Sequence, residues 1–306
     1  MNSTLQVGTL VVNRTQPAWG PGKIVKISPD RVHVLWRDLP DRRAKVMVAS
    51  AVERATEQQD PVLDNLPPLV ENDGRLLLPR ERLTFQQAVA KFLARFPQGF
   101  SDPSYIGDMH HGERRYKWAA HEFYVERLGG RLLRDLISSD LDGLVHRVEQ
   151  CMSQVNLLYM TESAAIRDAL KDASAAYSLF TKLADLLEAD AVSEAVFTPY
   201  AEAVCALPAE RGRVATWTVA TILPYLAQPD RHILLKPEVT KKAAESLGFE
   251  LNYRSDPNWL TYSSLLRMAA IYREKLAPLK PVDLIDVQSF FFVTGGGAYG
   301  GDVPGK

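Results

Sequence analysis

The polar segment 228–238 holds the residues whose chemical types best suit a reaction. It contains Asp230, His232, Lys236 and Glu238 and lies between two more apolar stretches. A carboxylate can stabilise developing positive charge or orient a water molecule. A lysine whose pKa is lowered by burial can act as a nucleophile. We therefore take Lys236, Glu238 and Asp230 as candidate catalytic residues, and His232 as a candidate substrate-binding residue.

Two helices are expected to position this segment. The preceding stretch, "ATWTVATILPYLA", is apolar on nearly all sides, which predicts a central helix. The following stretch, "EVTKKAAESLGF", predicts a short helix that ends at a glycine. Pro237 suits the first turn of this helix, where a cation is disfavoured. Lys236 is therefore exposed, paired with a neighbouring carboxylate, or placed for a reaction; the three ionisable residues also fit purely structural roles.

The residue order over 207–249 resembles the helix-hairpin-helix DNA glycosylases. The stretch follows their Leu-Pro…Gly…Trp-Thr…Ala order, and Trp217 with Thr218 is similar to the Trp-Thr pair of alkylation-repair members. The family places its catalytic carboxylate some way after this pair; here Glu238 lies 21 residues after Trp217 and Asp230 lies 13 after it. A Lys-Pro-Glu stands where the family has an Asp.

The resemblance implies an enzyme that flips a modified base out of DNA and hydrolyses its bond to the sugar. Lys236 would assist the carboxylate or attack the sugar and form a Schiff base. Hypermodified phage DNA is one such substrate, which would give the protein a role in antiviral defence. The alternative is a non-enzymatic scaffold that binds DNA or a polymerase. A nuclease has less support, because no carboxylate pair shows metal-binding spacing.

Further residues are candidates for holding a flipped base. Trp217 and Tyr116 carry rings that either stack on a base or pack in the core. Trp259 lies in "YRSDPNWLTY", which also fits a helix cap. Asp286 and Gln288 interrupt an apolar run, and buried polar groups need partners. Both could face the same cleft as the polar segment.

The N-terminal region predicts a small β-barrel. "VGTLVV", "GKIVKI", "RVHVLW" and "AKVMVA" are separated by turn formers. "GTLVVNRTQPAWGPGKIVKI" resembles the Tudor- or CarD-like barrels, which implies docking on DNA or on a DNA-bound protein. Residues 1–55 hold nine Lys and Arg residues against four acids, while Trp19 and Trp36 either stack on a ligand or close the core. The expected DNA contacts are Lys23, Lys26, Arg42, Arg43 and Lys45, with Arg213 from the body.

These patterns together predict an α+β protein. A barrel over 1–56 is followed by a proline-rich linker over 57–83, and helical periodicity predicts a domain over 84–294. The glycine-rich tail 295–306 is expected to be disordered.

The composition limits the remaining function classes. Apolar residues make up 46% and charged residues 24% of the chain, as in soluble globular proteins. No apolar run is long enough to cross a bilayer, and the N-terminus does not read as a signal peptide. Two cysteines, and histidines without matching acids, predict neither a disulfide nor a metal site. We expect a cytoplasmic protein without a cofactor.

Overall fold

The computed structural model divides the chain into two compact units, Met1–Arg82 and Leu83–Lys306, which are described separately. The residues that the structure describes are 5–39, 43–56, 59–60, 63–64, 66, 69–72, 75–77, 84–108 and 110–295. Arg42, as well as the predicted tail beyond residue 295, lies outside them.

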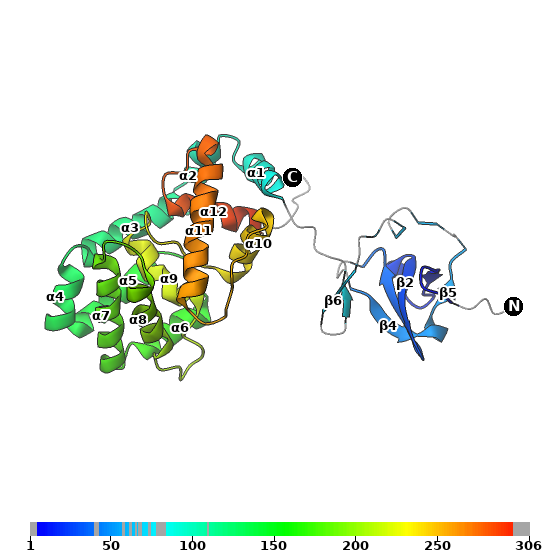
Figure 1. Cartoon of the computed structure of the whole chain (residues 1–306), viewed down its shortest axis with the longest axis horizontal. Coiled ribbons are helices and arrows are strands. Elements are labelled where there is room, and N and C mark those ends of the chain that lie inside the picture. The colour runs from blue at the N-terminus through cyan, green and yellow to red at the C-terminus, as the bar shows by residue number, and fades with distance from the viewer. Residues whose placement is uncertain are drawn as a thin grey trace. The chain divides into compact units, whose positions relative to one another are not determined.

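A curled antiparallel sheet forms the first unit (Figure 1). Its strand order is β4-β3-β2-β1-β5. The strands are β1 (Leu10–Val12), β2 (Gly22–Ser28), β3 (Arg31–Trp36), β4 (Lys45–Val48) and β5 (Glu53–Arg54), and short 3-10 turns lie at Pro17–Trp19 and Ala49–Ala51. The predicted small N-terminal barrel is therefore present as a half-closed sheet.

The core of this unit explains its tryptophans and one glycine. Trp36 is buried in the sheet, and its ring centroid lies 5.5 Å from that of Trp19. A Cβ atom on Gly22 would lie 2.5 Å from Val34 Cγ1 and 2.6 Å from Trp36 Cε3, so only glycine allows β2 to approach β3 this closely. Of the two roles left open for this pair, packing is the one that the structure displays.

The segment expected to be a linker differs from that expectation. It forms a hairpin of β6 (Val70–Asn72) and β7 (Arg75–Leu77), and the Ala44 amide donates to the Leu76 carbonyl. Leu63 is also buried, at 1% exposure. Proline content indicated an extended chain, but an apolar anchor and backbone pairing place this segment in the first unit.

The second unit is built from helices (Figure 1). They are α1 (Phe85–Arg95), α2 (Pro103–Ile106), α3 (Arg115–Leu128), α4 (Leu132–Ser139), α5 (Leu141–Ser153), α6 (Met160–Ala169), α7 (Ala173–Glu188), α8 (Glu194–Cys205), α9 (Trp217–Ala227), α10 (Pro237–Leu247), α11 (Trp259–Lys275) and α12 (Leu284–Gly295), with 3-10 turns at Gly99–Ser101 and Ala277–Leu279. The predicted α+β class, a small sheet followed by a mainly helical domain, is confirmed.

Helices α9 and α12 form the centre of this unit. Every residue of α9 from Trp217 to Leu226 is buried, as its all-round apolar sequence predicts. Helix α12 is buried along most of its length and packs against α1, α10 and α11. None of the helices in the described part of the chain is both long and apolar enough to span a membrane.

Candidate functional site

The polar segment is held rigidly against α9. The amide of His232 donates to the Gln228 carbonyl, at 2.9 Å, and the amide of Leu235 donates to Thr221 Oγ1, also at 2.9 Å. Residues 232–235 are buried, and this restricts where the backbone of the next residue, Lys236, can lie. Lys236 follows as the N-cap of α10, and Pro237 begins the helix as predicted.

The side chain of Lys236 is half-buried and lies against an aromatic ring. Its Nζ atom is 5.2 Å from the ring centroid of Tyr159. In the described part of the chain, Nζ forms neither a hydrogen bond nor an ion pair. Burial lowers the pKa of Lys236 below its ordinary value; Glu162 opposes this shift, and the positive charge of Lys117 adds to it. The amine is therefore easier to deprotonate than that of a free lysine.

Glu162, in the first turn of α6, is the carboxylate whose negative charge acts on this amine. The residue is 8% exposed. Its Oε1 accepts a hydrogen bond from Thr216 Oγ1 at 2.7 Å, and its Oε2 accepts one from the Tyr159 amide at 2.9 Å. Thr216 is the N-cap of α9 and also accepts from the Val219 amide, at 3.3 Å. The N-termini of α6 and α9 are thus joined by hydrogen bonds, and Lys236 brings the N-terminus of α10 to Tyr159.

Two large apolar side chains lie exposed at this corner. Tyr159 is 65% and Met160 89% exposed. Single exposed apolar residues are normal on protein surfaces, whereas contiguous apolar patches mark contact sites, and these two residues are adjacent in the chain. We call the set Tyr159, Met160, Glu162, Thr216 and Lys236 the α6/α9/α10 corner.

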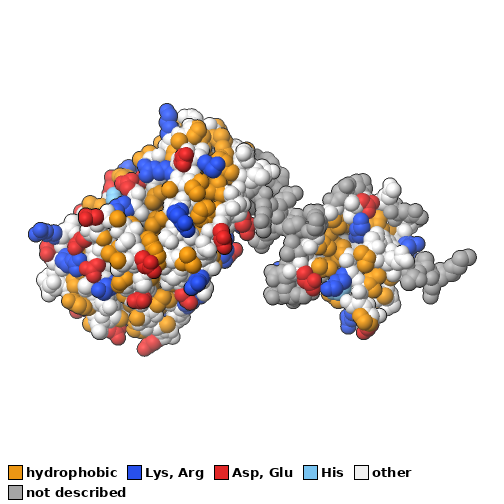
Figure 2. All heavy atoms as spheres, in the orientation of Figure 1, with side chains coloured by type: hydrophobic (Ala, Val, Ile, Leu, Met, Phe, Trp, Pro, Cys, Tyr) orange, Lys and Arg blue, Asp and Glu red, His pale blue; other side chains and the backbone are white. Residues whose placement is uncertain are grey.

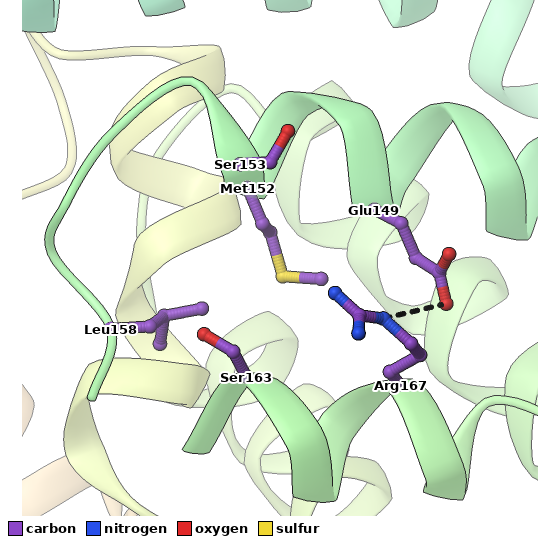
Figure 3. A pocket seen from close by; sticks show the side chains of 6 residues that line it. All are labelled: Glu149, Met152, Ser153, Leu158, Ser163 and Arg167. Atoms are coloured by element: carbon purple, nitrogen blue, oxygen red, sulfur yellow. Dashed lines mark ion pairs between the residues drawn. The ribbon is translucent and has the colours of Figure 1, made fainter. Parts of the chain in front are cut away.

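A small cavity lies on the neighbouring side of α6 (Figure 3). It measures about 50 Å³ and is lined by residues of α5, of α6 and of the loop between them. Arg167 and Glu149 form an ion pair of 3.8 Å at its edge. Ligand pockets usually measure about 300–1,000 Å³, so this cavity suits only a very small polar group.

A second cavity, of about 740 Å³, lies between α3, α4, α7 and the C-terminal end of α9. Ala227 and Gln228 line it, whereas Thr216 belongs to the opposite end of the same helix. The 11 residues of α9 span about 16 Å, at 1.5 Å per residue. The larger cavity is therefore separate from the α6/α9/α10 corner.

Beneath the corner, α3 and α12 share a buried ionic network. Lys117 is 1% exposed; its Nζ atom donates to Glu113 at 2.8 Å, to Gln288 Oε1 at 3.1 Å and to Ser289 Oγ at 2.8 Å. Burial is the largest single influence on the pKa of Lys117 and lowers it, but Glu113 and Tyr116 together leave this pKa raised. Lys117 is thus a fully paired structural cation, in contrast to Lys236.

Asp286 belongs to an adjoining part of this network. Its Oδ1 atom accepts from Tyr105 Oη at 2.5 Å and from Arg114 at 2.7 Å, and Arg114 also pairs with Asp283 at 2.8 Å. Burial raises the pKa of Asp286, and the charge of Arg114 opposes this rise. Asp286 thus finds the partners that a buried carboxylate needs, and it joins α12 to α2 and α3. Gln288 accepts from Lys117 through Oε1, but its buried Nε2 has no partner among the described residues.

Tyr116 packs against this network as well. It is half-buried, and Lys117 Nζ lies 5.5 Å from its ring centroid. Lys117 acts electrostatically on Lys236 and hydrogen-bonds Gln288. Gln288 and Tyr116 thus contact one buried lysine, which the sequence did not single out as a site residue.

The other two predicted catalytic residues are exposed. Asp230 lies in the turn after α9. Glu238 lies in the first turn of α10, its side chain 77% exposed and 3.5 Å from Lys241. In the part of the chain that the structure describes, neither Asp230 nor Glu238 forms a hydrogen bond or an ion pair with Lys236. A first-turn glutamate is favoured by the helix dipole, so the structural alternative accounts for Glu238.

The remaining predicted binding residues of the body lie in the core or in surface ion pairs. Trp217 is 1% exposed and donates from Nε1 to the Arg254 carbonyl, at 2.7 Å. His232 Nδ1 lies 2.9 Å from Tyr262 Oη, and burial lowers its pKa to about 3. Trp259 is half-buried, with its ring 6.0 Å from Phe197. Arg213 pairs with Asp256.

The cations predicted to bind DNA in the first unit lie close to acids of the following segment. Lys23 pairs with Asp64 at 2.9 Å, and Lys26 pairs with Glu71 at 3.2 Å. Arg43 and Lys45 lie next to and within β4. On the face of the molecule in Figure 2, basic and acidic side chains are interspersed. Lys23 and Lys26 are thus partly neutralised by acids of this segment.

Glu162 and Tyr159 are the functional candidates that sequence reasoning missed. The run Tyr-Met-Thr-Glu places a glutamate at the third helical position, which is a signal for a helix start. That signal identifies a cap, but it does not indicate which distant residue the carboxylate approaches.

Comparison with known proteins gives no relative: no protein-family model, curated protein or solved structure matches the chain. Within the described residues, no group of three His, Cys, Asp or Glu side chains is placed to hold a metal ion. The function is therefore argued from the geometry of the α6/α9/α10 corner.

Proposed function

We propose that the protein is a DNA glycosylase that removes a modified base, with the amine of Lys236 acting at the sugar carbon. One observation carries the proposal: Lys236 is half-buried, unpaired among the described residues, and has a lowered pKa beside a buried carboxylate. Active-site lysines that attack sugar or carbonyl carbons need these conditions. The resemblance over 207–249 places this lysine in the region that carries the catalytic carboxylate in helix-hairpin-helix glycosylases.

The reaction requires few groups. The neutral Nζ atom attacks C1′ of the nucleotide, the bond from C1′ to the base breaks, and its electron pair leaves with the base. The extra proton on the attacking nitrogen passes to a carboxylate, and water later releases the sugar. Breaking this bond develops positive charge on the sugar, which a nearby carboxylate stabilises.

The surroundings of Lys236 suit a nucleic acid. Helix N-termini favour phosphate groups, because their free amides and dipoles attract anions; α6, α9 and α10 all begin at this corner. The exposed ring of Tyr159 offers a face on which a base can stack. Met160 is an apolar side chain of the type that fills gaps between bases. The first unit would dock on DNA or on a DNA-bound protein.

Base release tests the proposal directly. Duplex oligonucleotides with and without modified bases are incubated with the protein, and alkali then cleaves the abasic sites formed. We expect cleavage of one modified substrate class, and loss of that cleavage in Lys236→Met. Lys241→Met is the matched control, because Lys241 is another α10 lysine, lying over Tyr253 at 4.2 Å. Equal cleavage by the Lys236→Met variant and the wild type would contradict the proposal.

A non-enzymatic scaffold is the second candidate function. The exposure of Asp230 and Glu238 favours it, because these are the carboxylates nearest in sequence to Lys236. In that case Lys236 would contact a phosphate, and the Lys236→Met variant would bind DNA more weakly. No base would be released from any substrate, so the alkali assay separates the two functions.

A further inference from the structure

The α6/α9/α10 corner contains a carboxylate that no sequence pattern linked to Lys236. We infer that Glu162 is the carboxylate that works with Lys236, accepting the proton of its amine and returning it during the reaction. The inference rests on the proposed function, and it assigns to Glu162 a role for which the sequence indicated Asp230 or Glu238.

The hydrogen bonds of Glu162 hold its carboxylate in one orientation. One oxygen accepts from the Thr216 hydroxyl at 2.7 Å, and the other accepts from the Tyr159 amide at 2.9 Å. A carboxylate has about four lone-pair positions, so these bonds leave positions for a further donor. A side chain that only capped α6 would need the Tyr159 amide alone. The second bond, to the start of α9, fixes Glu162 at the point where α10 also begins.

The position of Lys236 relative to Glu162 completes the pair. Both contact Tyr159: Glu162 through the backbone amide, and Lys236 over the ring at 5.2 Å. The negative charge of Glu162 acts directly on the amine of Lys236. The two are not locked in an ion pair, so the amine remains available to a substrate. Proton transfer requires hydrogen-bond reach or one bridging water, which the flexible stem of lysine permits.

Lys117, in the same protein, is a lysine whose donor positions are all occupied. Its ammonium donates to Glu113, Gln288 and Ser289, and it is 1% exposed. No donor position remains for a ligand, since an ammonium has three protons. Lys236 differs in both exposure and pairing. The contrast between the two lysines indicates that the pair formed by Lys236 and Glu162 is not simply a buried salt bridge.

The same pair suits condensation with an aldehyde. The neutral amine adds to the C1′ aldehyde of an abasic sugar, and the carbonyl oxygen becomes a hydroxyl by taking a proton. Glu162 accepts a proton from the nitrogen and gives one to the departing hydroxyl, which leaves as water. A carbon–nitrogen double bond remains, so the product is a Schiff base. Sodium borohydride supplies hydride to this double bond and makes the link permanent.

Trapping on abasic DNA is therefore the experiment. A labelled duplex with one abasic site is incubated with the full-length protein and borohydride, and the covalent adduct is followed over time. In Glu162→Gln the side chain keeps its size and still accepts hydrogen bonds, but it no longer takes a proton. We expect trapping to slow by about 100-fold, the usual contribution of a general base. Glu149→Gln on α5, whose parent carboxylate pairs with Arg167 at 3.8 Å, should trap as the wild type does.

Three outcomes would overturn the inference. The first is trapping by Glu162→Gln at the wild-type rate. The second is a loss in Asp230→Asn or Glu238→Gln in place of Glu162→Gln, which would return the role to the polar segment. The third is the absence of any adduct with the wild type. Abasic DNA has no base to release, so trapping on it tests the lysine and its carboxylate alone. If the wild type is trapped on abasic DNA but releases no base from modified DNA, only the proposed glycosylase activity is contradicted.

Thr216 provides a second, independent test. It is a positioning residue, because its hydroxyl contacts Glu162 and not the substrate. Thr216→Ser keeps this hydroxyl, and Thr216→Val replaces it with a methyl group of similar volume. We expect trapping to slow in Thr216→Val and to be rescued in Thr216→Ser. If Glu162→Gln does not fold, this pair decides: equal trapping rates in both variants would overturn the inference.

Discussion

The Nζ atom of Lys236 lies 5.2 Å from the centre of the Tyr159 ring. This contact joins the start of α10 to the start of α6, and it covers one side of the amine while most of the tyrosine stays in solvent. A cation over an aromatic face is stabilised by the ring. The ring is also 65% exposed, so under the proposed function Tyr159 would have a second role, which is stacking on a base.

The stacking role predicts the effect of removing the ring. Tyr159→Ala should weaken binding to DNA by about 1–3 kcal/mol, the usual contribution of one base stacked on an aromatic side chain. Tyr159→Phe keeps the ring and should bind as the wild type does. Fluorescence anisotropy with a labelled duplex at fixed salt measures both. Equal weakening in the two variants would mean that the hydroxyl, and not the ring, contacts the DNA.

The burial of Lys236 predicts the pH dependence of its amine and of stability. Its pKa lies below 10.5, so between the folded pKa and 10.5 the unfolded chain binds more protons than the folded one. Stability should therefore rise with pH across this window, and below it burying the charge carries a constant cost. At pH 7 the unfolding free energy of Lys236→Met, measured with urea, should exceed that of the wild type by up to about 1 kcal/mol. NMR titration of isotopically methylated lysines measures the pKa itself; a value at or above 10.5 would contradict the prediction.

The sequence could predict the helices around this site but not its carboxylate. The apolar stretch over 217–227 predicted a central helix, and α9 is buried throughout that centre. Lys236 at the start of α10 follows from the Pro237 beside it. Glu162, however, lies 74 residues before Lys236, and a hydrogen bond from Thr216 joins its helix to α9. Residues close in sequence, such as Glu238, were favoured because no local pattern encodes such a long-range contact.

The buried lysine predicts a double-mutant cycle. Lys117 and Glu113 are 1% and 5% exposed at their side chains and 2.8 Å apart. Glu113→Leu leaves the ammonium without its counter-charge and should cost about 3–5 kcal/mol of unfolding free energy. Lys117→Met should also destabilise, but Glu113→Leu combined with Lys117→Met should recover most of the loss. Urea unfolding of the four proteins measures the coupling; strictly additive effects would show that the pair does not act as a unit.

His232 predicts acid sensitivity. Burial and Arg231 lower its pKa to about 3, against 6.5 for a free histidine. Between these values the unfolded chain takes up a proton that the folded one does not, so stability should fall as pH falls from 6.5. The contribution is at most about 1.4 kcal/mol per pH unit. His232→Gln has no group that titrates in this range. The unfolding free energy of the wild type minus that of the variant should therefore decrease from pH 7 to pH 5. An unchanged difference would contradict the assignment.

The first unit shows where composition misleads. Prolines and acids over 57–83 indicated a linker, because such segments rarely bury enough apolar surface to fold alone. The segment does not fold alone: Leu63 inserts into the unit, and Lys23 binds both the Leu63 carbonyl and Asp64. The burial of Leu63 and the two contacts of Lys23 therefore hold the segment in the first unit, despite its proline-rich and acidic composition. The lysine that indicated DNA binding is the same residue that anchors the segment.

This anchoring predicts that Leu63 stabilises the first unit. Leu63→Ala should lower the unfolding free energy of that unit by about 2–5 kcal/mol, because it leaves a cavity at a side chain that is 1% exposed. Leu66→Ala, at a half-buried position three residues later, is the matched control and should cost less. Hydrogen exchange of β2 and β3 amides in the full-length protein reports on this unit separately from the helices. Unchanged protection of these strands in Leu63→Ala would show that the segment is a linker after all.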